Sequence, residues 1–115
     1  RRVLFRLKRV TIMCRNQQQI FYLNEIWYLE SSAHRTMIHT YENVQVCHDK
    51  ISDMEERMGE TFVRCHQSFL VNMKYIRRVE HDRFKLENGE EIPISKKRYM
   101  EARTRYFQYL EDAVS

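Results

Sequence analysis

Residues 62–72, FVRCHQSFLVN, are the most informative stretch of the sequence for the fold of this chain. Residues 62–65 open with two large apolar side chains and predict a β-strand. A polar loop of His66, Gln67 and Ser68 follows, and Phe69 and Leu70 return to apolar side chains that we expect to pack. The stretch therefore sets three hydrogen-bonding side chains between packed segments.

Toward the N-terminus, short apolar and aromatic runs alternate with polar breaks, which is typical of short antiparallel strands. Strands are expected at residues 10–14, 20–23, 26–29, 36–41 and 44–47. Residues 15–18 are expected to form a polar turn, residues 30–33 a polar loop, and Glu42 and Asn43 the turn of a hairpin.

Toward the C-terminus, further strands are expected at residues 76–80, 84–86 and 91–94. Asn88-Gly89 predicts a type I′ turn between the last two, since both central residues of such a turn need a positive φ. Pro93 cannot donate to a ladder, so we expect its strand at a sheet edge.

Two helices complete a mainly β fold. In residues 49–58, Ile51, Met54 and Met58 recur at helical spacing, with Asp49 expected as the N-cap and Gly59 as a C-terminal residue of positive φ. In residues 96–112 one side of the helical wheel is apolar, and Ser95 is expected as the N-cap. That side consists of Tyr99, Met100, Ala102, Tyr106, Phe107 and Leu110.

The length of 115 residues allows one domain with one core. We expect a single domain over residues 1–115 with its core at about 10–107, and residues 1–9 as a linker from an N-terminal domain outside this chain. No apolar run approaches the roughly 20 residues that cross a membrane. Three well-separated cysteines favour a reducing cytoplasm over a disulfide-stapled secreted domain.

The sequence offers no pattern for catalysis, a metal or a cofactor, so we expect a non-enzymatic domain. Cys47-His48 and Cys65-His66 are adjacent pairs, and neighbouring strand side chains point to opposite faces. Zinc-ligand spacing is missing, and two isolated glycines cannot form a phosphate-binding loop. A redox role for Cys65 would require an accessible thiolate and a nearby thiol.

Charge and loop composition suit a polyanionic partner. The net charge is +4, which favours nucleic acid only weakly, because many basic domains bind none. Three polar segments beside element boundaries carry donors able to reach base edges or phosphates. They are AHR at residues 33–35, HQS at residues 66–68 and SKKR at residues 95–98.

Taken together, these residues resemble the LytTR domain, the DNA-binding output module of many bacterial response regulators. FVRCHQSFLVN is similar to the family pattern F-x-R-x-H-x-S-x-L-V-N, supported by IWYLE at residues 26–30, the Asn88-Gly89 pair, and IPIS at residues 92–95 before basic residues. The resemblance implies an elongated arrangement of small antiparallel sheets with one short helix, at about residues 49–58, and a C-terminal helix at about 96–112.

The resemblance also implies that loops on one side enter successive major grooves. Base-reading positions would be His34, Gln67 and Lys97. Phosphate contacts or loop supports would be Arg35, Arg64, His66, Ser68, Lys96 and Arg98. The implied partner is double-stranded promoter DNA, with any homodimer on paired sites formed through a domain outside this chain.

Two positions depart from the family pattern. Gln67 stands where Arg or Asn is common, and its amide keeps the donor–acceptor pair that suits adenine. Lys97 stands where some members have Arg, and a point charge discriminates less than a planar guanidinium. Asn72 is expected to hold a turn through side-chain to backbone hydrogen bonds.

The alternative is a β-rich protein-interaction module that does not bind DNA. Its contact face would be the aromatic side of the last helix, formed by Tyr99, Tyr106, Phe107 and Tyr109. Core packing is the simpler explanation of that stripe, because its width is that of an ordinary helix face. RNA binding is a third option, without an evident platform of strand aromatics.

Overall fold

The computed structural model describes residues 8–114, which form ten strands and two α-helices. The strands are β1 (Arg9–Cys14), β2 (Gln17–Tyr22), β3 (Ile26–Ser32), β4 (Arg35–Thr40), β5 (Val44–Cys47), β6 (Phe62–His66), β7 (Phe69–Asn72), β8 (Ile76–Glu80), β9 (Arg83–Leu86) and β10 (Glu91–Pro93). The helices are α1 (Ile51–Met58) and α2 (Tyr99–Val114). The 3-10 turns are η2 (Leu23–Glu25), η3 (Met73–Tyr75) and η4 (Lys96–Arg98). The expected mainly β fold is confirmed.

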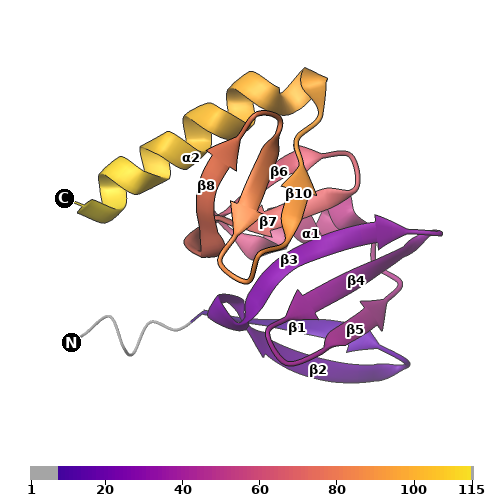
Figure 1. The fold of residues 1–115 in the computed structure, drawn as a ribbon. Coiled ribbons are helices and arrows are strands. Elements are labelled where there is room, and N and C mark those ends of the chain that lie inside the picture. Colours follow the sequence, from indigo (N-terminus) through magenta and orange to yellow (C-terminus); the bar gives the residue numbers. More distant parts are fainter. Residues whose placement is uncertain (1–7, 115) are drawn as a thin grey trace.

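Three antiparallel sheets carry the fold. The central sheet has five strands in the order β5-β4-β3-β7-β6, the N-terminal hairpin β1-β2 forms a second sheet, and β10-β9-β8 forms the third. Figure 1 shows the β1-β2 hairpin and the β8–β10 sheet at opposite ends of the molecule, with α2 beside β8. As expected for Pro93, β10 is an edge strand.

The central sheet is buried on both faces because neighbouring side chains alternate between two cores. In β3, Leu29 belongs to a core with β1, β2 and α1, whereas Tyr28 belongs to a core with β8–β10 and α2. In β7, Leu70 and Val71 divide between the same two cores. This double burial accounts for near-continuous apolar runs where a one-sided sheet would alternate with polar residues.

Tight turns replace two of the predicted loops. Arg15 and Asn16 both have positive φ, as do Ala33 and His34, so two-residue turns join β1 to β2 and β3 to β4. The predicted polar turn at residues 15–18 and polar loop at residues 30–33 were therefore too long. The strand β7 was also not predicted separately, because its four residues directly follow the short loop that ends β6.

The turn at Asn88-Gly89 differs from the type I′ prediction. Gly89 has a φ of 95°, but Asn88 does not have a positive φ. The Gly89 N–H donates to the Leu86 carbonyl at 2.9 Å, and the Leu86 N–H donates to the Glu90 carbonyl at 2.8 Å. This is a three-residue hairpin loop in which glycine supplies the one left-handed position.

The helix boundaries confirm one predicted cap and correct another. Lys50, not Asp49, occupies the N-cap position of α1, and no side chain caps that end. The Asp49 carboxylate instead accepts from Arg57 at 3.3 Å. Gly59 has the expected positive φ, 86°. Ser95 accepts from the Arg98 N–H at 3.3 Å, as predicted, although the first turn is the 3-10 turn η4.

The apolar side predicted for α2 divides into two faces. Ala102 and Tyr106 are buried in the second core, whereas Met100, Phe107 and Leu110 are exposed. The core packing predicted for the aromatic stripe is therefore wrong for Phe107, whereas Tyr99, Tyr106 and Tyr109 pack against the second core.

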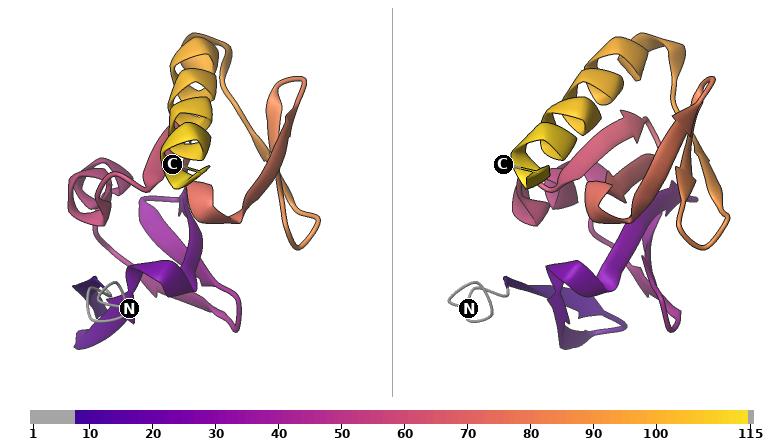
Figure 2. Two further views of the ribbon diagram at one scale, coloured as in Figure 1. Left: turned by 90° about the vertical axis from the view of Figure 1, so that its left-hand side faces the viewer. Right: turned by 60° about the vertical axis from the view of Figure 1, so that its left-hand side comes forward.

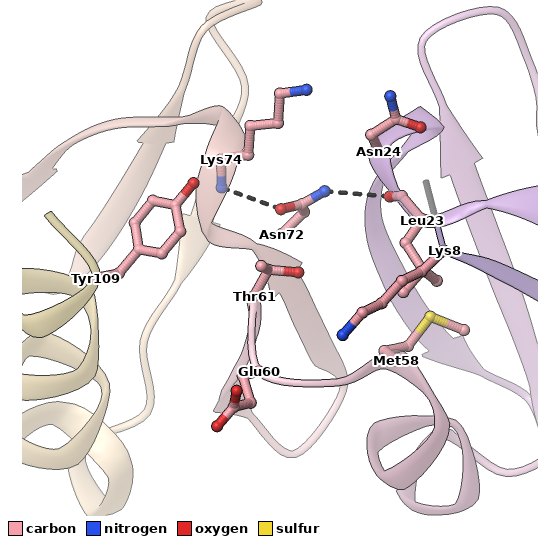
Figure 3. Close-up of a pocket in the computed structure, with 9 residues that line it drawn as sticks. All are labelled: Lys8, Leu23, Asn24, Met58, Glu60, Thr61, Asn72, Lys74 and Tyr109. Carbon is pink, nitrogen blue, oxygen red and sulfur yellow. Dashed lines mark hydrogen bonds between the residues drawn. The ribbon is translucent and has the colours of Figure 1, made fainter. Parts of the chain in front are cut away.

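Asn72 joins the 3-10 turns η2 and η3 to the central sheet, as predicted for a turn-holding residue. Its Nδ2 donates to the Ile26 carbonyl at 2.9 Å and the Leu23 carbonyl at 3.3 Å, and its Oδ1 accepts from the Lys74 N–H at 3.0 Å. The side chain is only 2% exposed. Figure 3 shows it between η2 and η3, lining a pocket of about 280 Å³.

The described residues span 40 × 38 × 24 Å. Two of these dimensions are nearly equal, so the arrangement is flattened and not elongated along one axis. Both views of Figure 2 show α2 at one end of the molecule and the β1-β2 hairpin at the other. These dimensions correct the elongated shape that was expected, whereas the small antiparallel sheets are present as expected. Most of the predicted linker lies outside the described residues, and Arg9 already begins β1.

Candidate nucleic-acid interface

The β3–β4 turn presents the first predicted pair of contacts. Ser32 and Arg35 close the turn as the last paired residues, with Ala33 and His34 between them in the left-handed region. The turn contains only two residues, and the side chains of His34 and Arg35 are both exposed. A left-handed backbone is uncommon for a non-glycine residue and fixes the direction in which His34 leaves the sheet.

The β6–β7 turn is held from beneath by Arg64. Its Nε donates to the His66 carbonyl at 2.9 Å and its guanidinium donates to the Gln67 carbonyl at 2.6 Å. The same guanidinium pairs with Glu55 of α1 at 2.8 Å. With 13% of its side chain exposed, Arg64 is positioned to support the turn more than to meet a phosphate. Gln67 is exposed, and its side-chain amide has no partner among the described residues.

A second set of hydrogen bonds links this turn to β3. The Ser68 N–H donates to His66 Nδ1 at 3.0 Å. The Ser68 carbonyl accepts from the Ser31 N–H at 2.8 Å. The two turns that carry His34 and Gln67 are thus joined through the ladder of the central sheet.

These turns and the start of α1 enclose one groove of about 380 Å³. It is lined by Ser31, His34, Arg35, Thr36, His48, Asp49, Lys50, Ile51, Ser52, Arg64, Gln67 and Ser68. Five of the nine predicted contact residues, from segments about 30 residues apart, therefore meet at one surface.

The third predicted loop lies beside the second without sharing its groove. The Ser95 N–H donates to the Cys65 carbonyl at 2.8 Å, which fixes η4 next to the end of β6. Lys96 and Lys97 are exposed, and Lys96 lines a separate groove of about 390 Å³ with His81 and Tyr99. In Figure 1 the start of α2, the β6–β7 turn and the β3–β4 turn follow one another down the right-hand edge.

The charge of the groove comes mainly from two cations. Arg64 is compensated by Glu55, and Asp49 by Arg57. Arg35 and Lys50 are exposed and form no ion pair with any described residue. An anion approaching this face meets uncompensated positive charge, which favours a phosphate backbone.

Sequence reasoning missed His48, Lys50 and Ser52, which enter the groove from the start of α1. From the sequence, His48 is considered only with Cys47 as a metal-binding pair, and residues 49–58 only as a helix. The one available signal was a second basic, polar boundary before a helix, of the kind already noted at residues 95–98.

Cys65 lies beneath this edge as a buried thiol. It is 0% exposed, and burial raises its pKa to about 12. The thiol therefore stays protonated at neutral pH, and the accessible thiolate needed for a redox role is absent.

Two further kinds of feature, a metal-binding cluster and a membrane-spanning helix, are absent from the described residues. Among residues 8–114, no group of three or more His, Cys, Asp or Glu side chains is arranged to hold a metal ion. In the same part of the chain, neither helix has the length and apolar composition to cross a membrane.

Comparison with known proteins adds a family and a fold. The family model of the LytTr DNA-binding domain matches residues 16–106. The structure is similar to the LytTr DNA-binding domain of a protein described as a methyl-accepting/DNA response regulator from Bacillus cereus. The TM-score is 0.71 at 24% identity, over 86% of this chain and 95% of that chain. No match was found among curated proteins.

Proposed function

The chain belongs to the LytTR family of DNA-binding domains, and from this premise we propose that it recognises specific sequences in double-stranded DNA through the edge formed by its three polar loops. The observation that carries the proposal is the groove in which the β3–β4 and β6–β7 turns meet, with Arg35 and Lys50 uncompensated beside it. A rigid sheet ladder holds both turns, so their side chains can approach a duplex with little loss of entropy.

Three exposed side chains are proposed to reach base edges. Gln67 has an unpartnered amide on a turn fixed by Arg64, which suits a bidentate contact with adenine. His34 leaves a turn with a defined backbone direction, and Lys97 projects from the start of α2. Lys97 is expected to contribute the least sequence discrimination because it is a point charge.

The remaining residues divide between phosphate contact and support. Arg35, Lys50, Lys96 and Arg98 are proposed to neutralise phosphates, because none of them forms an ion pair with another described residue. Arg64, His66 and Ser68 are proposed to hold the β6–β7 turn, because their polar atoms already bond within it.

The size of the domain suits contacts in successive major grooves. Its longest dimension is 40 Å, and neighbouring major grooves on one face of B-DNA lie about 34 Å apart. We propose that the loops at the two ends of this edge enter neighbouring major grooves, with the β6–β7 turn between them.

The solved structure that this fold resembles comes from a protein described as a response regulator. We therefore propose that this chain is the output domain of a bacterial transcription regulator that acts on promoter DNA in the cytoplasm. An input domain, and any dimer that it forms, would lie outside this chain.

A gel-shift titration against a pool of random duplexes tests the proposal. We expect binding that weakens steeply with salt, together with a subset of duplexes that remains bound when competitor DNA is added. If competitor DNA displaced all duplexes equally, specific recognition would be contradicted. If no duplex bound even at low salt, the DNA-binding role would be contradicted. The rival interaction module is less favoured, because three of the four aromatic residues of its contact face, Tyr99, Tyr106 and Tyr109, pack in or against the second core, although Phe107 is exposed.

A further inference from the structure

A second surface of the molecule lies along α2, which begins at the DNA-binding edge, where Met100 and Lys96 line one groove, and runs away from that edge. Met100, Phe107 and Leu110 are 69%, 43% and 39% exposed, although all three are large apolar residues. A soluble domain rarely leaves a row of such side chains open unless another surface covers it.

The spacing of this row is that of a helix–helix seam. Met100, Arg103, Phe107 and Leu110 follow one another at intervals of three, four and three residues, which is the spacing of the a and d positions of a heptad. The neighbouring face of the helix, with Ala102 and Tyr106, is buried against the domain. The exposed row can therefore pair with another helix without disturbing the fold.

Arg103 fits this seam despite its charge. Its guanidinium lies 5.4 Å from the Tyr99 ring centroid and 5.2 Å from that of Phe107. This stacking lays the side chain along the row and leaves its charge at the rim.

The distribution of charge along α2 indicates that its partner is a second copy of the same helix. Basic residues outnumber Glu101 in the first part of the helix, in η4 and at Arg103 and Arg105, whereas the last turns carry Glu111 and Asp112 and no basic residue. An antiparallel pair of identical helices sets the basic part of each against the acidic part of the other. The surface is thus complementary to itself about a two-fold axis.

We propose that two copies of this chain associate through an antiparallel pair of α2 helices, with Phe107 packed on Phe107 at the two-fold axis and Arg103 of each copy facing Glu111 of the other. In Figure 1, α2 runs away from the β3–β4 and β6–β7 turns, so this pairing leaves those two turns accessible.

The association is expected to be weak. Helices of 16 residues are about 24 Å long, so one pair buries less than the ~1,600 Å² of a typical stable complex. We expect a dissociation constant in the micromolar range or above.

Sedimentation equilibrium of the chain from about 5 μM to about 1 mM tests the pairing, because this range brackets the expected dissociation constant. The wild type should shift from monomer toward dimer, and Phe107→Glu should remain monomeric. Gln108→Glu adds the same charge on the polar side of α2 and should behave as the wild type. Thermal unfolding of each variant checks the fold, and Leu110→Lys provides a second seam variant.

Charge reversal tests the register. Arg103→Glu and Glu111→Arg should each weaken association by about tenfold, and the double variant should recover it. A wild type that stays monomeric throughout would overturn the proposal, as would a folded Phe107→Glu variant that still dimerises. A double variant without recovery would overturn the antiparallel register.

Discussion

At the scale of single residues, Gln67 and Arg64 have different proposed roles in DNA recognition: Gln67 contacts a base and Arg64 supports the turn that carries Gln67. Gln67 offers a free side-chain amide, while Arg64 bonds the two carbonyls that fix the turn beneath it. The family resemblance assigned base reading to Gln67 but left open whether Arg64 contacts a phosphate or supports the loop. Burial separates the two residues, and burial depends on Glu55 reaching Arg64 from α1.

Gln67→Ala should cost about 1–3 kcal/mol of binding free energy on the preferred site and relax specificity at one base pair. The reason is the loss of a bidentate contact with no change in net charge. Titrations on the preferred duplex and on its single-base variants measure both effects. Equal losses on all duplexes would mean that Gln67 does not contact a base.

Arg35→Ala and Arg64→Ala should weaken binding for different reasons. Removing Arg35 should reduce the slope of log K against log salt by about one unit, because one phosphate contact is lost. Removing Arg64 should leave the slope nearly unchanged and speed hydrogen exchange at Gln67 and Ser68, because two turn carbonyls lose their donor. A full unit of slope lost by Arg64→Ala would instead make it a phosphate contact.

Cys65 gives a prediction on pH. Burial raises its pKa to about 12 in the folded chain, so only the unfolded chain ionises near the ordinary value of 9.0. The resulting contribution to stability is complete below about pH 9 and is lost as the pH rises toward 12. In the native state the Cys65 thiol should resist a thiol-alkylating reagent at pH 8. Rapid alkylation without unfolding would contradict the burial.

At the scale of elements, strand and helix placement followed from apolar periodicity, whereas turn geometry did not. Ala33 and His34 adopt left-handed conformations without glycine, because the paired strands on either side hold them there. No local pattern signals such a turn. The exposed row on α2 was missed for a similar reason, since a helical wheel shows which residues are apolar but not how much of that face the sheets cover.

Asn72→Ala should lower the free energy of unfolding by about 3 kcal/mol. The substitution leaves the buried Ile26 carbonyl and the Lys74 N–H without their partner, and both 3-10 turns lose their link to the sheet. Urea unfolding measures the change. Lys74→Ala, which removes an exposed side chain from the same turn, serves as the control and should cost far less.

At the scale of the whole molecule, the site exists because the central sheet brings distant segments together. The sequence and the family pattern identified nine exposed or partly exposed polar residues, but only the order β5-β4-β3-β7-β6 sets the β3–β4 turn beside the β6–β7 turn. The same order brings the start of α1, with Lys50, into the groove. Those contacts span long sequence separations that no local motif records.

The central claim is that the loop edge recognises a DNA sequence and that Gln67 reads one of its bases. Selection from a random duplex library, with the wild type and Gln67→Ala in parallel, tests it most directly. We expect the wild type to enrich a defined motif and the variant to enrich the same motif with one position degenerate. No enriched motif with the wild type, or an unchanged motif with the variant, would contradict it.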